Sequence, residues 1–292
     1  MQLYDSGRLD TLRRLLGTAL WWGQQLRVVQ GAVAAAKVAF AATLLGVRTP
    51  LAVPIVALVA FGVYTANDLA DIEEDAINCP DRSSFVADHP AFVALLTVGA
   101  FTVGGGLAWA AGGPPALAVA FVPLWAALCY SLPVPRGGRR LKDVFALNTA
   151  LVAAAWAVTV TAVPLVLAGR PFGPVAAAVG LFFFLRSFVS VEVFNVRDVA
   201  GDAATGVRTL PVVLGIGPTR RVLALLDGCT LALLAALVTV PGTVRPAVLA
   251  VPVVGYSLVL TWLSGRTERT DALCLAKDCE YLLLGAVAVL VA

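Results

Sequence analysis

Residues 51–75 read LAVPIVALVAFGVYTANDLADIEED, an apolar run that ends in a cluster of acidic residues. In a helix, Asn67, Asp71 and Asp75 are spaced at i, i+4 and i+8, which places their side chains on one face, with Asp68 at its edge. Carboxylates in a row repel one another unless a cation binds between them. Mg²⁺ is usually held in proteins by one or two carboxylates together with substrate phosphates. The stretch therefore predicts a membrane helix that ends in a metal site.

A second acidic segment follows a later apolar run. Asp198 and Asp202 are again four residues apart, and Asn195 shares their helix face one turn earlier. One such pair alone would more often be a solvated helix face. Two pairs of the same kind, each at the end of an apolar run, predict a metal-bridged diphosphate site.

Basic residues near both acidic segments could supply the remaining contacts to a diphosphate, whose oxygens need hydrogen-bond donors even when metal ions are bound. Arg82 follows the first segment by seven residues and Arg208 follows the second by six. Lys142 and Arg139 lie in another polar connection. We expect these four side chains to hold the diphosphate.

The composition places the chain among multi-pass membrane proteins. Of its 292 residues, 60% are hydrophobic and 13% are charged, against roughly 25% charged in soluble domains. We expect one domain over residues 1–292, with residues 1–26 as an amphipathic segment at the membrane surface. The net charge of +3 is spread over short connections, and we expect no nucleic-acid partner.

The apolar runs predict an all-α bundle, because each is close to the roughly 20 residues that cross a bilayer as a helix. They are continuous and do not alternate, unlike the strands of a membrane barrel. We predict nine transmembrane helices, at residues 27–47, 50–66, 91–111, 114–131, 144–168, 174–195, 221–241, 246–263 and 273–292.

The distribution of basic residues predicts the orientation, since cytoplasmic loops carry an excess of Lys and Arg. With nine helices, the connections on one side of the membrane carry most of the Lys and Arg residues, and those on the other side carry only Arg48, Arg170 and Arg245. The N-terminus and both acidic segments should therefore face the cytoplasm, in a multi-pass protein of the cell membrane. The basic set is Arg8, Arg13, Arg14, Arg82, Arg136, Arg139, Arg140, Lys142, Arg197, Arg208, Arg220, Arg221, Arg266 and Arg269.

The remaining polar residues bear on two questions: whether the protein could bind zinc, and what the charged residues within the predicted helices do. His89 is the only histidine and the five cysteines form no CxxC pair, so a zinc site is not expected. Lys37 lies in the middle of the first helix, where a charge is costly unless it faces a cavity or a partner. It could face the diphosphate cavity or form a structural ion pair. We expect Arg186 and Glu192 to be structural partners between helices.

Together these motifs resemble the UbiA superfamily of intramembrane prenyltransferases. The resemblance rests on NDxxDxxxD at 67–75, DxxxD at 198–202 and GDxxxGVRTLPV at 201–212. It implies two Mg²⁺ ions on an isoprenoid diphosphate, held by Asn67, Asp71, Asp75, Asp198 and Asp202. Tyr130 and Lys142 look like a Tyr and a Lys of the family, although their spacing is longer than the usual YxxxK.

The resemblance implies a transferase mechanism. The diphosphate would leave with assistance from Asp71, Asp198, Tyr130 and Lys142, and a lipophilic acceptor would capture the allylic cation in an apolar cavity. Many relatives carry an RPxxxG-type segment after the first motif, and here Arg82 is followed by SSFV. This departure leaves open a terpene synthase that acts on the prenyl diphosphate alone. A transporter or membrane scaffold is the third alternative, but no inverted repeat is evident.

Overall fold

The computed structural model describes residues 11, 17–18, 21–131 and 144–292, which form helices without any strand. Short helices connect the long ones near both acidic segments. The long helices are α2 (Val28–Leu45), α3 (Ala52–Ala70), α6 (Pro90–Ala120), α7 (Val122–Ser131), α8 (Leu147–Leu167), α9 (Pro174–Thr205), α11 (Ile216–Val238), α12 (Val244–Leu263) and α13 (Thr270–Val291). The short ones are α4 (Ile72–Asn78), α5 (Pro80–Asp88) and α10 (Leu210–Leu214).

Seven helices in the described part are long and apolar enough to cross a membrane. The predicted all-α architecture is confirmed for the described residues, and the seven candidate spans agree with a multi-pass membrane protein, but the count of nine is not confirmed. The predicted spans 91–111 and 114–131 correspond to a single apolar run, Pro90–Cys129. The predicted span 273–292 lies in α13, whose first half carries Asp271, Lys277 and Asp278 and is therefore less apolar.

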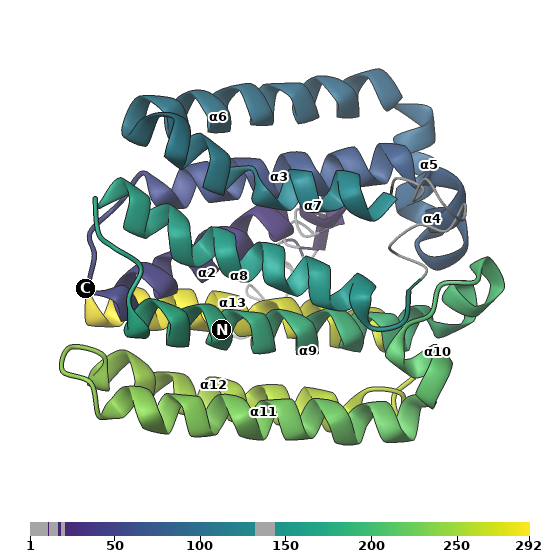
Figure 1. Ribbon diagram of the computed structural model, residues 1–292. Helices are drawn as coiled ribbons and strands as arrows, with labels where there is room; N and C mark the ends of the chain where they lie inside the picture. Colours follow the sequence, from purple (N-terminus) through teal and green to yellow (C-terminus); the bar gives the residue numbers. More distant parts are fainter. Residues whose placement is uncertain (1–10, 12–16, 19–20, 132–143) are drawn as a thin grey trace, which may run out of the picture.

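The run Pro90–Cys129 bends sharply at Gly113, which has φ 64° and ψ −156°. Only glycine adopts this backbone conformation without steric cost. Pro114 and Pro115 follow and cannot donate backbone hydrogen bonds to the preceding turn. The chain turns back here, so that the first arm of α6 and α7 run in opposite directions (Figure 1).

The surface of the bundle is strongly apolar. Trp109, Trp125 and Trp262 are each more than half exposed, and Leu225 is 68% exposed. Soluble monomers rarely present such large apolar surfaces. The interior contains an aromatic cluster of Phe40 on α2 with Phe182 and Phe183 on α9, all fully buried.

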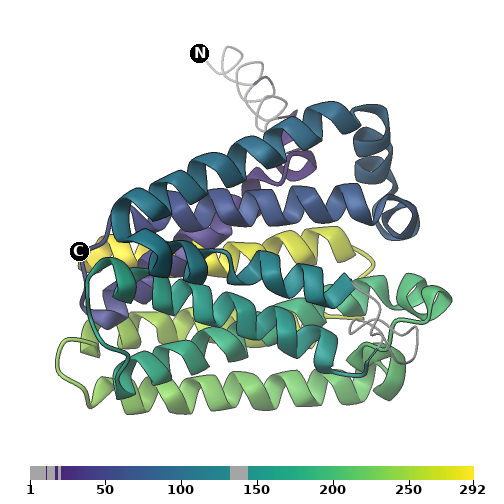
Figure 2. The same ribbon diagram turned by 45° about the horizontal axis from the view of Figure 1, so that its top comes forward.

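The arrangement of the helices brings the two acidic segments to the same end of the bundle. The C-terminal end of α3, α4 and α5 lie at the end where α9 finishes and α10 begins (Figure 1). Turning the molecule shows the same grouping (Figure 2). Helix α4 packs against α9, which makes a direct contact between segments over 100 residues apart.

The local structure of both acidic segments differs from the prediction. The first is not one continuous helix, because α3 ends at Ala70 and Asp71 is non-helical, with φ −111° and ψ 26°. The second lies in a helix, as its spacing predicts, but this helix, α9, continues to Thr205, beyond the predicted end of the span at residue 195. Gly206 then ends α9 with φ 80°, in the left-handed conformation that glycine favours.

Candidate active site

A cavity of about 310 Å³ lies where the ends of α3, α4 and α9 meet the start of α8. We call it the first cavity. Its oxygen-bearing lining comes from both acidic segments and from the start of α8. These residues are Asn67, Asp71, Asp75, Asn78, Asn148, Thr149, Asn195, Asp202, Thr205 and Thr209.

The lining of the first cavity changes from polar to apolar along each helix. On α3, Val63 and Tyr64 precede the polar segment and lie deeper in the bundle. On α9, Val191 likewise precedes the second acidic segment and lies deeper in the bundle. Helix α8 runs the other way, and its later residues Val152 and Trp156 are the apolar ones. One end of the cavity therefore suits a charged group and the other a hydrocarbon.

Four of the predicted metal ligands share this cavity, Asn67, Asp71 and Asp75 from the first segment and Asp202 from the second, together with Asn195, which was predicted to lie on the same helix face as Asp202. The Asp202 carboxylate accepts a hydrogen bond of 3.2 Å from the Thr209 hydroxyl. The break at Asp71 does not separate these side chains, because α4 folds back against α9.

A glycine allows this close contact between the segments. A Cβ atom at Gly201 would lie 2.0 Å from Asn78 Oδ1, far closer than any real side chain permits. Gly201 is buried on α9 and Asn78 ends α4. A side chain at position 201 would therefore have to displace the Asn78 side chain from its contact with α9, a constraint that the sequence reasoning did not identify.

Asp68, a predicted metal ligand, has a different role in the structure. Its carboxylate accepts hydrogen bonds from both Arg27 Nε, at 2.8 Å to Oδ2, and Arg27 NH2. Asp68 is only 3% exposed and does not line the first cavity. The ion pair instead joins the start of α2 to the last turn of α3.

Asp198 is also separated from the first cavity. Arg197 donates to it from two nitrogens, Nε at 2.6 Å from Oδ1 and NH2 at 2.8 Å from Oδ2. Asp198 lines a second cavity of about 430 Å³, which lies between the segment before α2, α4, α5, the end of α9 and the start of α13. Arg27, Asp75 and Asn78 line both cavities, which therefore share a wall.

The predicted basic residues are distributed unevenly. Arg82 lines the second cavity, where burial and the nearby Arg27 lower its pKa. Arg208 is exposed and lines neither cavity. Arg139 and Lys142 lie outside the described residues, as does the side chain of Tyr130 at the end of α7. Arg27, which the sequence reasoning did not single out, is the basic residue in the wall between the cavities.

Lys37 does not line the first cavity. Its Nζ atom is 4.0 Å from the centre of the Tyr281 ring and 5.8 Å from that of Trp156, and it donates a 3.5 Å hydrogen bond to the Ser187 hydroxyl. Trp156 does line the cavity and stacks on Tyr64, with ring centres 5.9 Å apart. Lys37 therefore contacts the cavity only through this aromatic wall.

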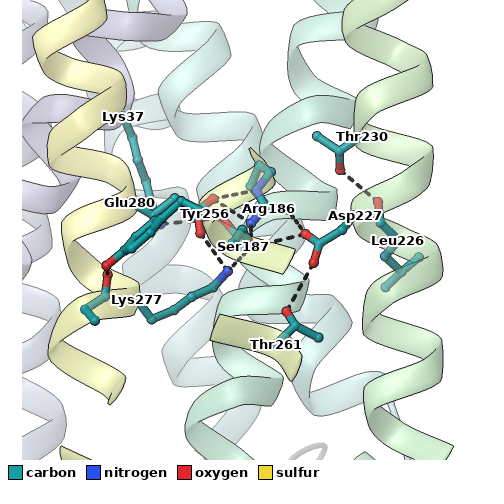
Figure 3. Close-up of polar contacts among 12 residues, drawn as sticks. Lys37, Arg186, Ser187, Leu226, Asp227, Thr230, Tyr256, Thr261, Lys277 and Glu280 are labelled. Carbon is teal, nitrogen blue, oxygen red and sulfur yellow. Dashed lines mark hydrogen bonds and ion pairs between the residues drawn. The ribbon is translucent and has the colours of Figure 1, made fainter. Parts of the chain in front are cut away.

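A buried ionic cluster lies beside Lys37 and joins four helices (Figure 3). Arg186 on α9 pairs with Asp227 on α11 and Glu280 on α13, and all three side chains are fully buried. Lys277 Nζ lies 2.6 Å from Glu280 Oε2. The expected structural role of Arg186 agrees with these contacts. Glu192 is apart from the cluster and accepts a hydrogen bond from Thr149 on α8.

The donor set of the first cavity fits Mg²⁺. All candidate ligands are carboxylate or amide oxygens, which hard divalent cations prefer. Within the described residues, no group of three His, Cys, Asp or Glu side chains could hold an ion alone, so a substrate would have to supply further oxygens. Burial raises the pKa of Asp75 to about 6, and Arg27 opposes the shift. This carboxyl group is thus partly protonated until a cation binds.

Comparison with solved structures supports the fold. A UbiA homologue from Archaeoglobus fulgidus, bound to GPP and Mg²⁺, superposes with a TM-score of 0.68 over 92% of this chain and 98% of that chain, at 17% identity. A UbiA homologue from Aeropyrum pernix without ligand gives a TM-score of 0.67 over 90% and 98% of the two chains, at 16% identity.

Sequence comparison is more specific. The chain is 31% identical over 240 residues to digeranylgeranylglyceryl phosphate synthase of Methanopyrus kandleri, which covers 77% of this chain and 82% of that protein. A synthase of the same name from Methanoculleus marisnigri is 29% identical over 182 residues, 60% of this chain and 61% of that protein. The model of the UbiA prenyltransferase family matches residues 18–276. The chain therefore belongs to the UbiA prenyltransferase family.

Proposed function

We propose that the protein transfers a prenyl group from an isoprenoid diphosphate to a lipophilic acceptor in a Mg²⁺-dependent reaction. One observation carries this proposal: the first cavity joins both acidic segments at its polar end and is apolar at depth. The diphosphate would lie at the polar end and the hydrocarbon chain between α3, α8 and α9. Such a division suits no simple water-soluble substrate.

The oxygen ligands Asn67, Asp71, Asp75 and Asp202 would hold two Mg²⁺ ions on the diphosphate, with Asn195 beside them. Bound Mg²⁺ would neutralise the negative charge that develops on the departing diphosphate. Asp198 is the remaining predicted ligand, and it would join the site only by exchanging its contact with Arg197. The apolar walls exclude water, which would otherwise capture the allylic cation.

The names of the two relatives favour a hydroxyl acceptor of the glyceryl phosphate class. In that reaction the bond between C1 of the prenyl chain and the diphosphate oxygen breaks, and its electron pair leaves with the diphosphate. The acceptor oxygen then forms the new bond to C1 and loses its proton. The product is a prenyl ether.

We further propose that residues 1–292 form one domain in the lipid bilayer, with the cavities on the cytoplasmic side. The excess of basic residues in the connections that the sequence assigns to this side supports the orientation. The reversal at Gly113 supports two crossings within Pro90–Cys129. Counting α13 as a further crossing gives nine.

Product analysis tests the function. Purified protein is incubated with dimethylallyl, geranyl or geranylgeranyl diphosphate, with and without a glyceryl phosphate lipid, and with Mg²⁺ or EDTA. We expect a prenyl ether by mass spectrometry only with both substrates and Mg²⁺. Asp202→Asn should abolish it, whereas Asp88→Asn, at the exposed end of α5, should not. A cyclic hydrocarbon formed without acceptor would instead identify a terpene synthase.

A further inference from the structure

The second cavity has a lining suited to a polar ligand. It opens between the segment before α2, the α4–α5 connection, the end of α9 and the start of α13. Arg27, Asp75 and Asn78 line both cavities, so the two cavities meet at these residues. A ligand here would thus lie against the polar end of the first cavity, where the prenyl diphosphate is proposed to bind.

Several groups in this lining lack a hydrogen-bond partner among the described residues. Gln25 is only 9% exposed, yet its Oε1 atom accepts no hydrogen bond from the part of the chain that the structure describes. Within the same residues, Gln30 Oε1 accepts none either, and the Arg82 Nε donor is unpaired. Buried polar atoms are normally satisfied, so unpaired ones in a cavity wall indicate a missing ligand or water. This set offers a donor and acceptors, which suits a group with hydroxyl and anionic oxygens.

Five carboxylates line the second cavity, and four have other roles. Asp75 belongs to the proposed metal site, and Asp198 is held by Arg197. The side chain of Asp271 is 90% exposed at the rim, and Asp81 is exposed in the first turn of α5. Asp278 on α13 remains.

The surroundings of Asp278 suit a proton acceptor near the reaction centre. Burial disfavours the Asp278 carboxylate, and its cationic neighbours Lys37, Arg27, Arg197 and Arg82 oppose this effect. It also acts electrostatically on Tyr64, which lines the first cavity. Asp278 therefore lies in the second cavity close to the wall that the two cavities share.

We propose that the second cavity binds the polar head of the acceptor, and that the Asp278 carboxylate accepts the proton of the acceptor's nucleophilic hydroxyl group. The inference rests on the proposed transferase function and deepens it. As the bond between C1 and the diphosphate oxygen breaks, the acceptor oxygen bonds to C1 and its proton passes to Asp278. Gln25 and Arg82 orient the head group. The proton leaves to water at the exposed rim beside Asp271.

The experiment compares Asp278→Asn with Asp88→Asn, a matched change at an exposed carboxylate of α5 that lines neither cavity. With saturating prenyl diphosphate and Mg²⁺, we expect the kcat of ether formation to fall about 10²–10⁴-fold in Asp278→Asn, the usual contribution of a general base. The slow release of diphosphate without acceptor should stay within about twofold of the original rate, as should all parameters of Asp88→Asn. Gln25→Leu should raise the KM for the acceptor without changing that for the prenyl diphosphate.

Different results would separate the two proposals. If the unaltered protein forms the ether and Asp278→Asn forms it equally fast, the role of Asp278 is wrong and the transferase function stands. If Asp278→Asn or Gln25→Leu instead raises the KM for the prenyl diphosphate or Mg²⁺, the second cavity belongs to the diphosphate site and the inference is overturned. If the unaltered protein forms no ether with any acceptor, the proposed function itself fails, and this inference fails with it.

Discussion

Replacing Arg186 with Met should destabilise the bundle strongly, because it removes the cation at the centre of the buried cluster. Arg186 is fully buried and bonded to Asp227, Glu280 and Ser257. In the variant, Glu280 keeps its contact with Lys277. Among the described residues, Asp227 keeps hydrogen bonds from the hydroxyl groups of Ser257 and Thr261, so this buried carboxylate loses the cation bonded directly to it.

Breaking a buried ion pair from one side costs about 3–5 kcal/mol. Because Glu280 stays paired, we expect the lower part of this range, about 3–4 kcal/mol. With roughly 2–4 °C lost per kcal/mol in a chain of this size, the unfolding temperature should fall by roughly 10 °C. Tryptophan fluorescence during heating in detergent would measure the shift. Arg221→Met, an exposed position on the same helix as Asp227, should change it little.

The double variant Arg186→Met with Asp227→Leu is the decisive comparison. Removing both charges leaves no unpaired carboxylate, so it should unfold at a higher temperature than Arg186→Met alone. If Arg186→Met unfolds at the same temperature as the original protein, the cluster does not stabilise the bundle. If the double variant loses the sum of the single changes, the two residues act independently and the argument from pairing is wrong.

Three further predictions concern the first cavity. Gly201→Ala should displace the Asn78 side chain and disturb the packing of α4 on α9, costing about 1–3 kcal/mol and lowering Mg²⁺-dependent turnover. Gly106→Ala, where a Cβ meets nothing within 4 Å, is the control, and equal turnover in both variants would contradict the packing argument. Because the pKa of Asp75 is raised to about 6, protons should compete with Mg²⁺ for this carboxylate. The affinity of the protein for Mg²⁺, measured by titration, should therefore fall as the pH is lowered from about 7 to about 5. An affinity that does not change with pH would exclude Asp75 as a ligand. Ala155→Trp at the apolar end should shift the ratio of turnover toward geranyl over geranylgeranyl diphosphate, and an unchanged ratio would place the prenyl chain elsewhere.

The sequence predicted the helices and the meeting of the two acidic segments well. Apolar runs near membrane length mark helices directly, and spacing within a helix identified Asn67, Asp75 and Asp202 as side chains of one cavity. Neither kind of signal contains information about a neighbouring helix. The pairing of Asp68 with Arg27 depends on how α2 packs against α3, 41 residues away in sequence, and could not be read from a face of α3.

Two other differences have local causes. The break at Asp71 interrupts a segment whose residues gave no helix-ending signal, since neither Gly nor Pro occurs between Asn67 and Asp75. The close approach of α9 and α4 needs a glycine at position 201, but a single glycine in a helical pattern has many possible reasons. Packing between distant segments decides which reason applies.

Helix α4 is a separate short piece, bounded by the bends at Asp71 and Cys79. A unit of seven residues between two bends can shift while the long helices stay in place. Opening the polar chamber to release spent pyrophosphate would then require movement only at the aqueous boundary. Turnover should consequently respond little to the thickness or fluidity of the surrounding lipid.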